Sequence, residues 1–375
     1  MDKDMDRENK TTFIIGAGAS TEFNFPISSG LVEKIRDCLE NVVGQILAEH
    51  GTFTHNEREI RSFSEFLKKN GDANIIHKCI KYLSLKRDAS GNVTNQLDKN
   101  ELNKYISAAR TINNKLITGT TSIDTYLGWN DTTDYEVLIS KIAITAIIRN
   151  CEYNSSIYEN HNRKIDFRSQ ALSNSYLVQI YAKLNRMCNL KPEQIFKNKN
   201  FIIFNYDLCF EQLFFKYLRQ NRSKSAIEAY QIIKSANIIH PHGTSNDFEL
   251  SADGETNFGN INIDYNNCAS FINHSRSNIK LHTELELNME KKKQLEEMIY
   301  EANSVFILGF GYHPDNLQIL SPSKNYKQIP NRKLIANIFG MKETGAISTL
   351  QKLGSIANGA DIFPLDRYIT RDINY

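Results

Sequence analysis

The stretch Thr12-Phe13-Ile14-Ile15-Gly16-Ala17-Gly18-Ala19-Ser20-Thr21 decides the fold of this chain. Its apolar residues predict a buried strand, its glycines a tight turn, and the residues that follow are compatible with a helix. Strand, glycine turn and helix in this order are typical of the first unit of a doubly wound α/β domain. In such a unit the turn approaches a phosphate group, so we expect Gly16, Ala17, Gly18 and Ser20 to contact one. The G-x-G-x-x-G pattern is incomplete, and a turn that binds nothing is the alternative.

Further short apolar runs, rich in Ile, Val and Phe, predict more strands that are buried on both faces. The expected strands are residues 13–15, 201–204, 237–239, 305–308 and 334–339, with a weaker one at 361–363. Apolar residues at helical spacing predict helices between them, at residues 31–48, 208–218 and 291–302. The expected fold class is therefore α/β, with a Rossmann-like parallel sheet flanked by helices.

The segment between the first two expected strands is far too long for a simple crossover connection. It contains helical patterns at residues 60–67, 75–85, 101–112, 135–149 and 175–184. The polar segment 88–100 is expected to be an exposed loop, and residues 244–270 are expected to be irregular. We therefore expect one Rossmann-like domain, formed by residues 1–48 and 196–375, with a mostly helical insertion at residues 49–195.

The composition fits a globular protein, with 41% hydrophobic and 23% charged residues and a formal net charge of +2. This small charge argues against a general attraction to nucleic acid or to a membrane surface. No apolar segment resembles a signal peptide or approaches the ~20 residues needed to cross a bilayer. The six cysteines are widely spaced, without a C-x-x-C pair, which argues against a zinc knuckle and a disulfide framework. We expect a cytoplasmic protein.

Four more motifs carry polar residues suited to chemistry. Three of them directly follow expected strands: Asn205-Tyr206-Asp207, His240-Pro241-His242-Gly243 and Gly309-Phe310-Gly311-Tyr312. The fourth, Ser122-Ile123-Asp124-Thr125-Tyr126-Leu127, lies within the insertion. Each has a structural alternative, such as a helix cap, a histidine bonded to a loop carbonyl or a plain turn. Because the carboxyl ends of parallel strands meet at one edge, the motifs together predict a single crevice.

In order and content, these motifs resemble the sirtuin-like family, specifically its bacterial NAD-consuming branch, from Phe13 to about Asp315. GAGAS looks like the phosphate loop of the family, and FNYD looks like the segment with an essential Asn and a following Asp. HPHG resembles the segment whose His precedes Gly, GFGY the late glycine turn, and SIDTYL a recurrent element of this branch. The resemblance implies hydrolysis of NAD to nicotinamide and ADP-ribose, by an NAD-depleting effector of anti-phage defence and abortive infection.

The resemblance also implies roles for individual residues. Asn205 is expected to hold a water or a ribose hydroxyl, His242 to take a proton from one of them, and Asp207 to orient the site electrostatically. The expected NAD contacts beyond the phosphate loop are Gly309, Gly311, Asp315 and Asp124. His240 faces the same side on an extended strand, but His242 is favoured because a glycine follows it, as in the family.

One departure from the family narrows the expected activity. Deacylating sirtuins carry a four-cysteine zinc module after the His-Gly pair, where this chain has Cys268 alone. We therefore expect NAD as the substrate and no zinc. A non-catalytic sensor of NAD or ADP-ribose and an ADP-ribosyltransferase are the alternatives. Related defence proteins imply a HerA-type ATPase or another defence-system partner, and the apolar surface of the insertion predicts a homo-oligomer.

Overall fold

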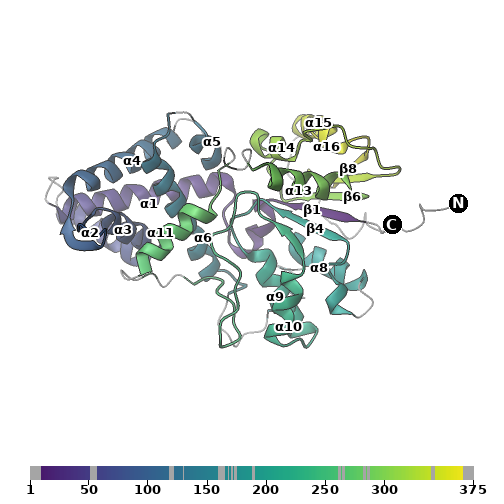
Figure 1. The fold of residues 1–375 in the computed structure, drawn as a ribbon, viewed down its shortest axis with the longest axis horizontal. Helices are drawn as coiled ribbons and strands as arrows, with labels where there is room; N and C mark the ends of the chain where they lie inside the picture. Colours follow the sequence, from purple (N-terminus) through teal and green to yellow (C-terminus); the bar gives the residue numbers. More distant parts are fainter. Residues whose placement is uncertain are drawn as a thin grey trace.

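The six expected strands form one parallel sheet in the computed structural model (Figure 1). In chain order they are β1 (Thr11–Ile15), β4 (Lys199–Ile203), β5 (Asn237–Ile239), β6 (Ser304–Leu308), β7 (Lys333–Asn337) and β8 (Asp361–Leu365). Across the sheet the order is β5-β4-β1-β6-β7-β8, and each neighbouring pair is parallel. Numbered among themselves, these strands have the Rossmann order 3-2-1-4-5-6. The predicted fold class is therefore confirmed.

The structure describes residues 10–50, 57–117, 122–129, 131–158, 175–187, 191–260, 267–281, 288–338 and 343–365, together with residues 165–167, 169, 172, 263 and 284. The strand expected at residues 334–339 ends at Asn337, and residue 339 lies outside the described residues. In the segments just given, no helix combines the length and the apolar character that crossing a membrane requires.

Alternate residues of the strands face two different helical layers, which explains why the strands are apolar throughout. In β1, Phe13 and Ile15 belong to one core and Ile14 to the other. The first core also contains residues of α8 (Tyr176–Met187), α9 (Cys209–Asn221) and α10 (Ala226–Lys234). The second contains residues of α13 (Met289–Tyr300), α14 (Pro314–Leu320) and α16 (Gly354–Ala357), and α15 (Glu343–Lys352) precedes α16.

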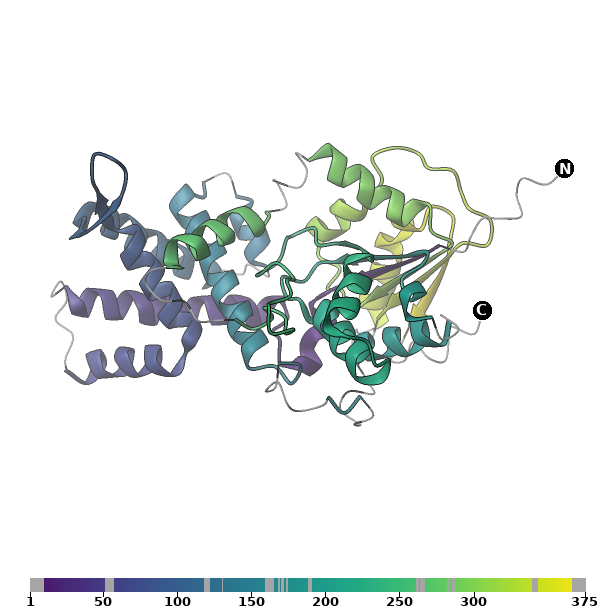
Figure 2. The same ribbon diagram turned by 60° about the horizontal axis from the view of Figure 1, so that its bottom comes forward.

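Helix α1 (Ser28–Glu49) runs from the edge of the sheet into an elongated helical part of the molecule (Figures 1 and 2). Its apolar stripe, with residues such as Ile35, Leu39 and Val42, is buried. It packs against α2 (Glu57–Lys69), α3 (Gly71–Leu83), α4 (Lys99–Ile117) and α6 (Asp134–Tyr153). Helix α11 (Cys268–Asn278), which is distant in sequence, lies on α3 and α6.

The helices expected in the insertion are all present, with shifted ends. The last of them, α8, packs against α9 beside the sheet, whereas the others form the helical part. A short helix, η2 (Pro192–Gln194), precedes β4. The domain boundaries given above stay a prediction. Residues 244–260 are irregular apart from one bridge between Leu250 and Thr256, and α11 begins at Cys268, before the expected end of the irregular segment.

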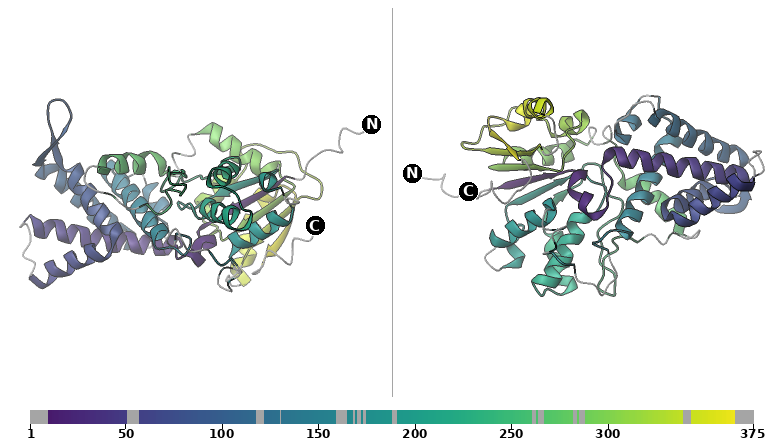
Figure 3. Two further views of the ribbon diagram at one scale, coloured as in Figure 1. Left: turned by 90° about the horizontal axis from the view of Figure 1, so that it is seen from below. Right: turned by 180° about the vertical axis from the view of Figure 1, so that it is seen from behind.

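The polar segment at residues 88–100 is more ordered than expected. Strands β2 (Leu85–Arg87) and β3 (Val93–Leu97) form an antiparallel hairpin that projects from the helical part (Figure 3). The Asp88 side chain closes the turn by accepting hydrogen bonds from the amides of Ser90 and Asn92, both at 2.9 Å. The prediction of a loop was wrong here because the strands are short and their few apolar residues, Leu85, Val93 and Leu97, are only partly buried, so the sequence shows no clear strand pattern.

Candidate active site

The carboxyl ends of β1, β4, β5 and β6 bring four of the motifs to one edge of the sheet. Strand β1 lies between β4 and β6, and the chain winds away from it in opposite directions. Such a switch point is where open α/β sheets form a crevice for ligands. The short helix η1 (Ala17–Phe23) starts here directly after β1.

The two glycine turns at this edge pack directly against each other. The amides of Gly16 and Gly18 donate hydrogen bonds to the carbonyls of Leu308 and Gly309, at 2.9 and 2.8 Å. Gly309 has φ +59°, and a Cβ there would lie 2.2 Å from the amide nitrogen of Ala19. The two turns can therefore approach this closely only because these positions are glycine, since a Cβ would clash with the opposite backbone. The amide of Ala19 donates to the carbonyl of Gly16 at 2.9 Å, so three amides of the turn already have acceptors, and the expected phosphate contact stays a prediction.

Asn205, Ser20 and Asp207 form a buried chain of hydrogen bonds. The Asn205 side-chain amide donates to the Ser20 hydroxyl at 2.9 Å, and that hydroxyl donates to Asp207 Oδ1 at 3.2 Å. Asp207 Oδ1 also accepts from the amide of Cys209, the first residue of α9, at 3.0 Å. Burial raises the pKa of Asp207, although these hydrogen bonds oppose the shift. Asn205 is 4% exposed, and its Oδ1 has no hydrogen-bond partner in the described part of the chain.

His242 is held by a side chain rather than by the loop carbonyl of the structural alternative. Its Nε2 lies 2.9 Å from Asn316 Oδ1. Because an amide oxygen only accepts, this contact favours the neutral tautomer that carries its proton on Nε2, in which Nδ1 is an acceptor. That Nδ1 is buried and has no hydrogen-bond partner among the described residues. The imidazole ring lies near the rings of Phe204 and Tyr206, with centroid distances of 5.5 and 6.0 Å.

The glycine after His242 has a structural reason. Gly243 has φ +74°, and a Cβ there would lie 1.6 Å from the carbonyl oxygen of Asn278 at the end of α11. The loop that carries His242 can therefore approach α11 only with glycine at this position. Asn316, which orients His242, was missed in the sequence. Its position after Pro314-Asp315, just beyond the second glycine turn, is the signal that could have found it.

Helix α5 (Ile123–Leu127) lies across the same edge of the sheet. The Ser122 hydroxyl caps it by accepting from the amide of Asp124 at 3.2 Å. The Tyr206 hydroxyl donates to Asp124 Oδ1, and the Thr125 hydroxyl donates to Asp315 Oδ2 at 3.0 Å. Asp124 and Thr125 thus join α5 to the loop after β4 and to the start of α14, and the contact of Asp124 and Asp315 with NAD stays a prediction.

Gly311, another expected NAD contact, is exposed. A Cβ added there would meet no atom within 4 Å. Its packing, unlike that of Gly309, therefore gives no reason for the glycine, and the expected contact of Gly311 with NAD stays a prediction.

Glu152, at the end of α6, contacts both loops that carry the catalytic candidates. Its carboxylate accepts hydrogen bonds from the amide of Leu208 and the hydroxyl of Ser245 at 3.1 Å, and from the amide of Gly259 at 3.2 Å. The side chain is fully buried, and this burial raises its pKa to about 7. Sequence patterns did not single out Glu152, because a glutamate in a helix usually faces solvent.

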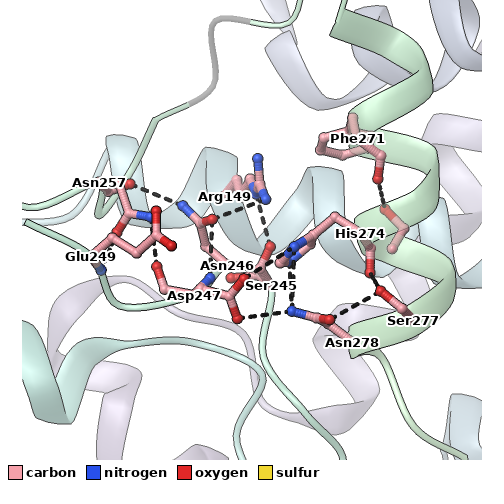
Figure 4. Close-up of polar contacts among 11 residues, drawn as sticks. Arg149, Ser245, Asn246, Asp247, Glu249, Asn257, Phe271, His274, Ser277 and Asn278 are labelled. Atoms are coloured by element: carbon pink, nitrogen blue, oxygen red, sulfur yellow. Dashed lines mark hydrogen bonds and ion pairs between the residues drawn. The ribbon is translucent and has the colours of Figure 1, made fainter. Parts of the chain in front are cut away.

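Arg149, one turn earlier on α6, supports the loop after β5 (Figure 4). Its guanidinium donates to the carbonyl of Ser245 at 2.8 Å and to Asn246 Oδ1 at 3.2 Å. It also stacks over the ring of Phe271 on α11, 5.0 Å from the ring centroid. Helix α6 therefore ties the helical part of the molecule to the loop that carries His242.

The described residues contain no group of three or more His, Cys, Asp or Glu side chains that could hold a metal ion. Cys268 is buried on α11, where its thiol contacts that of Cys79 on α3. The expectation that the protein works without zinc stays a prediction. No protein-family model matches the chain, and no curated protein matches it. The likeness to the sirtuin-like family therefore depends on the motifs alone.

Proposed function

We propose that the chain is an NAD glycohydrolase that cleaves NAD to nicotinamide and ADP-ribose. The observation that carries the proposal concerns two buried acceptors, Asn205 Oδ1 and His242 Nδ1, on two loops at the same edge of the sheet, which have no hydrogen-bond partner among the described residues. Buried polar atoms in proteins nearly always have a hydrogen-bond partner. Ribose hydroxyls and a water molecule are donors that suit both acceptors.

The reaction needs few groups from the protein. The bond between the ribose C1′ and the nicotinamide nitrogen breaks, and its electron pair leaves with nicotinamide, which becomes neutral. A water oxygen forms the new bond to C1′, and the water gives up a proton. Because the departing group needs no protonation, the site has to stabilise an oxocarbenium-like transition state and accept that proton.

Each candidate residue fits one of these tasks. Asn205 Oδ1 accepts a hydrogen bond from the attacking water or from a ribose hydroxyl. His242 Nδ1 takes the proton, since Asn316 holds the other ring nitrogen as the donor. Asp207 adds a buried carboxyl group linked to Asn205 through Ser20. In its ionised form this group favours the positive charge that develops on the ribose.

The wider role in the proposal comes from the resemblance alone. It is that of a cytoplasmic, homo-oligomeric effector that depletes NAD in bacterial anti-phage defence, with a HerA-type ATPase or another defence-system protein as partner. Mass photometry at micromolar concentration checks the oligomer, and a monomer as the one species found would contradict it.

Product analysis after incubation with NAD tests the activity. We expect equal amounts of nicotinamide and ADP-ribose from the native chain and neither product from Asn205→Ala or His242→Ala. Asn41→Ala and His50→Ala, on and just after α1, are matched controls that should keep full turnover. A native chain that binds NAD in a thermal-shift assay but releases no nicotinamide, alone or with its neighbouring gene products, would instead indicate a sensor.

A further inference from the structure

A buried histidine–glutamate pair lies behind the Asn205 loop. His240 follows β5 directly, and its Nδ1 lies 3.0 Å from the backbone carbonyl oxygen of Asn205. Its Nε2 lies 2.9 Å from Glu211 Oε1, in the first turn of α9. A carbonyl oxygen only accepts, so Nδ1 carries a proton, and the carboxylate favours a second proton on Nε2. The pair therefore connects the ends of β4 and β5 to α9.

The surroundings favour the charged form of His240. Burial by itself disfavours the imidazolium, but Glu211, the Asn205 carbonyl and Asp207 outweigh it and raise the pKa of His240. The charged or titratable groups that face the ring are Glu211 from α9 and Asp207 from the loop between β4 and α9.

A contribution to folding stability does not by itself explain why this pair is buried. The side chains of His240 and Glu211 are 10% and 7% exposed, so both charges are largely removed from water. A buried ion pair often contributes less to stability than apolar residues of similar size. Glu211 Oε2 adds a further cost, since it is buried without a hydrogen-bond partner in the described structure. The pair does, however, fix one specific atom, the carbonyl oxygen of Asn205.

Asn205 is thereby held at two points. His240 binds its backbone from the β5 side, and Ser20 binds its side-chain amide from the β1 side. With both contacts made, the free atom of the side chain is Oδ1, the acceptor assigned above to water or a ribose hydroxyl. We propose that His240 and Glu211 form a positioning pair that holds Asn205 so that Oδ1 faces the substrate. The catalytic meaning of this pair rests on the proposed NAD hydrolysis.

The test uses the full chain and measures kcat and KM for NAD in four variants. Glu211→Gln keeps the shape of the side chain but removes its charge, and His240→Ala removes the contact with the Asn205 carbonyl. His240→Asn restores a donor near the position of Nδ1. His77→Asn is the matched control, because His77 Nε2 lies 3.1 Å from Glu49 Oε1 in the helical part, far from Asn205 in the fold.

A small displacement of a catalytic group costs roughly 100-fold in rate, so we expect kcat to fall by about that factor in Glu211→Gln and His240→Ala. KM should stay within about threefold, because substrate binding is retained. His240→Asn should recover part of kcat, and His77→Asn should keep the native value. Native kcat in both pair variants, an equal loss in His77→Asn, or a change confined to KM would overturn the proposal.

Amide hydrogen exchange distinguishes a failure of the positioning pair from a failure of the proposed NAD hydrolysis. If the native chain does not cleave NAD, the proposed glycohydrolase function fails. Amide hydrogen exchange across residues 203–209 then tests whether the positioning pair holds the Asn205 loop. Faster exchange there in Glu211→Gln and His240→Ala than in His77→Asn would show that it does. Exchange equal to that of the native chain would overturn it.

Discussion

The side-chain amide of Asn205 donates a hydrogen bond of 2.9 Å to the hydroxyl of Ser20, although the two residues are 185 positions apart in the chain. The parallel pairing of β1 with β4 brings them together, because Ile15 lies beside Ile203 at the ends of the two strands. Ser20 was expected to contact phosphate. That contact stays a prediction, and the Ser20 hydroxyl also links Asn205 to Asp207, which makes it part of the catalytic arrangement in the proposed function.

Replacing Ser20 by alanine should lower both stability and turnover. The change leaves the Asn205 amide and Asp207 Oδ1 without a buried partner, which costs about 1–3 kcal/mol of the free energy of unfolding. We expect kcat for NAD to fall by roughly 10- to 100-fold, since Asn205 is less well oriented. Urea unfolding and product analysis measure the two effects. Thr21→Ala is the control, because the Thr21 hydroxyl is exposed and bonds to the carbonyl of Gly18; equal effects in both variants would contradict the prediction.

Asn316→Ala should allow the neutral His242 ring to populate both tautomers. Without the amide oxygen, Nε2 loses the acceptor that assigns its proton, so the ring samples both neutral tautomers. ¹⁵N NMR of the histidine ring should report the Nε2–H form in the native chain and a mixture in the variant, with a lower kcat. Gln318→Ala, on the exposed side of the same helix, is the control. A native ring spectrum in Asn316→Ala would show that another group fixes the tautomer.

The sheet could be predicted because each of its strands is marked by a short apolar run of consecutive residues. Strands buried on both faces need apolar side chains at successive positions, so β1, β4 and β6 stand out as continuous runs. The candidate site follows from the same runs, since residues after parallel strands meet at one edge. Asn205 and His242 could therefore be placed near each other without a structure.

The supporting residues could not be predicted, because their burial depends on tertiary contacts. Glu211 and Glu152 are buried and Asn316 is half-buried on helices, where polar side chains usually face solvent, and nothing in their neighbours in sequence marks this burial. The β2–β3 hairpin was not predicted for a different reason, since its strands are short and carry only three partly buried apolar residues, Leu85, Val93 and Leu97. Its one local signal is Asp88, a typical turn residue.

Gly243→Ala should destabilise the fold strongly. A left-handed conformation costs a residue with a Cβ roughly 1–2 kcal/mol, and the new Cβ would also lie 1.6 Å from the carbonyl oxygen of Asn278. The His242 loop or the end of α11 must therefore move. Gly311→Ala is the matched control, since its Cβ meets no atom within 4 Å and surface changes usually stay within about ±0.5 kcal/mol. Thermal unfolding compares the two, and a Gly243→Ala midpoint equal to that of Gly311→Ala would contradict the prediction.

Glu152 should make the stability of the chain depend on pH. Its folded pKa is raised to about 7 by burial, whereas an unfolded glutamate has a pKa of ~4.3. Between these values the folded state holds a proton that the unfolded state lacks. The stabilising contribution is therefore fully present below the lower value and is lost as the pH rises through about 7, with a slope of at most about 1.4 kcal/mol per pH unit.

Glu152→Gln isolates this contribution, because glutamine has no proton to lose. We expect the free energy of unfolding of the native chain, measured relative to the variant by urea titrations at pH 5, 6, 7 and 8, to fall between pH 5 and 7 and then level off. Other titrating groups cancel in this difference unless they contact Glu152. Glu301→Gln is the control, since Glu301 forms an exposed ion pair with Lys10. A native-minus-variant difference that is constant across this range would mean that the three donors around Glu152 keep it ionised in spite of its burial.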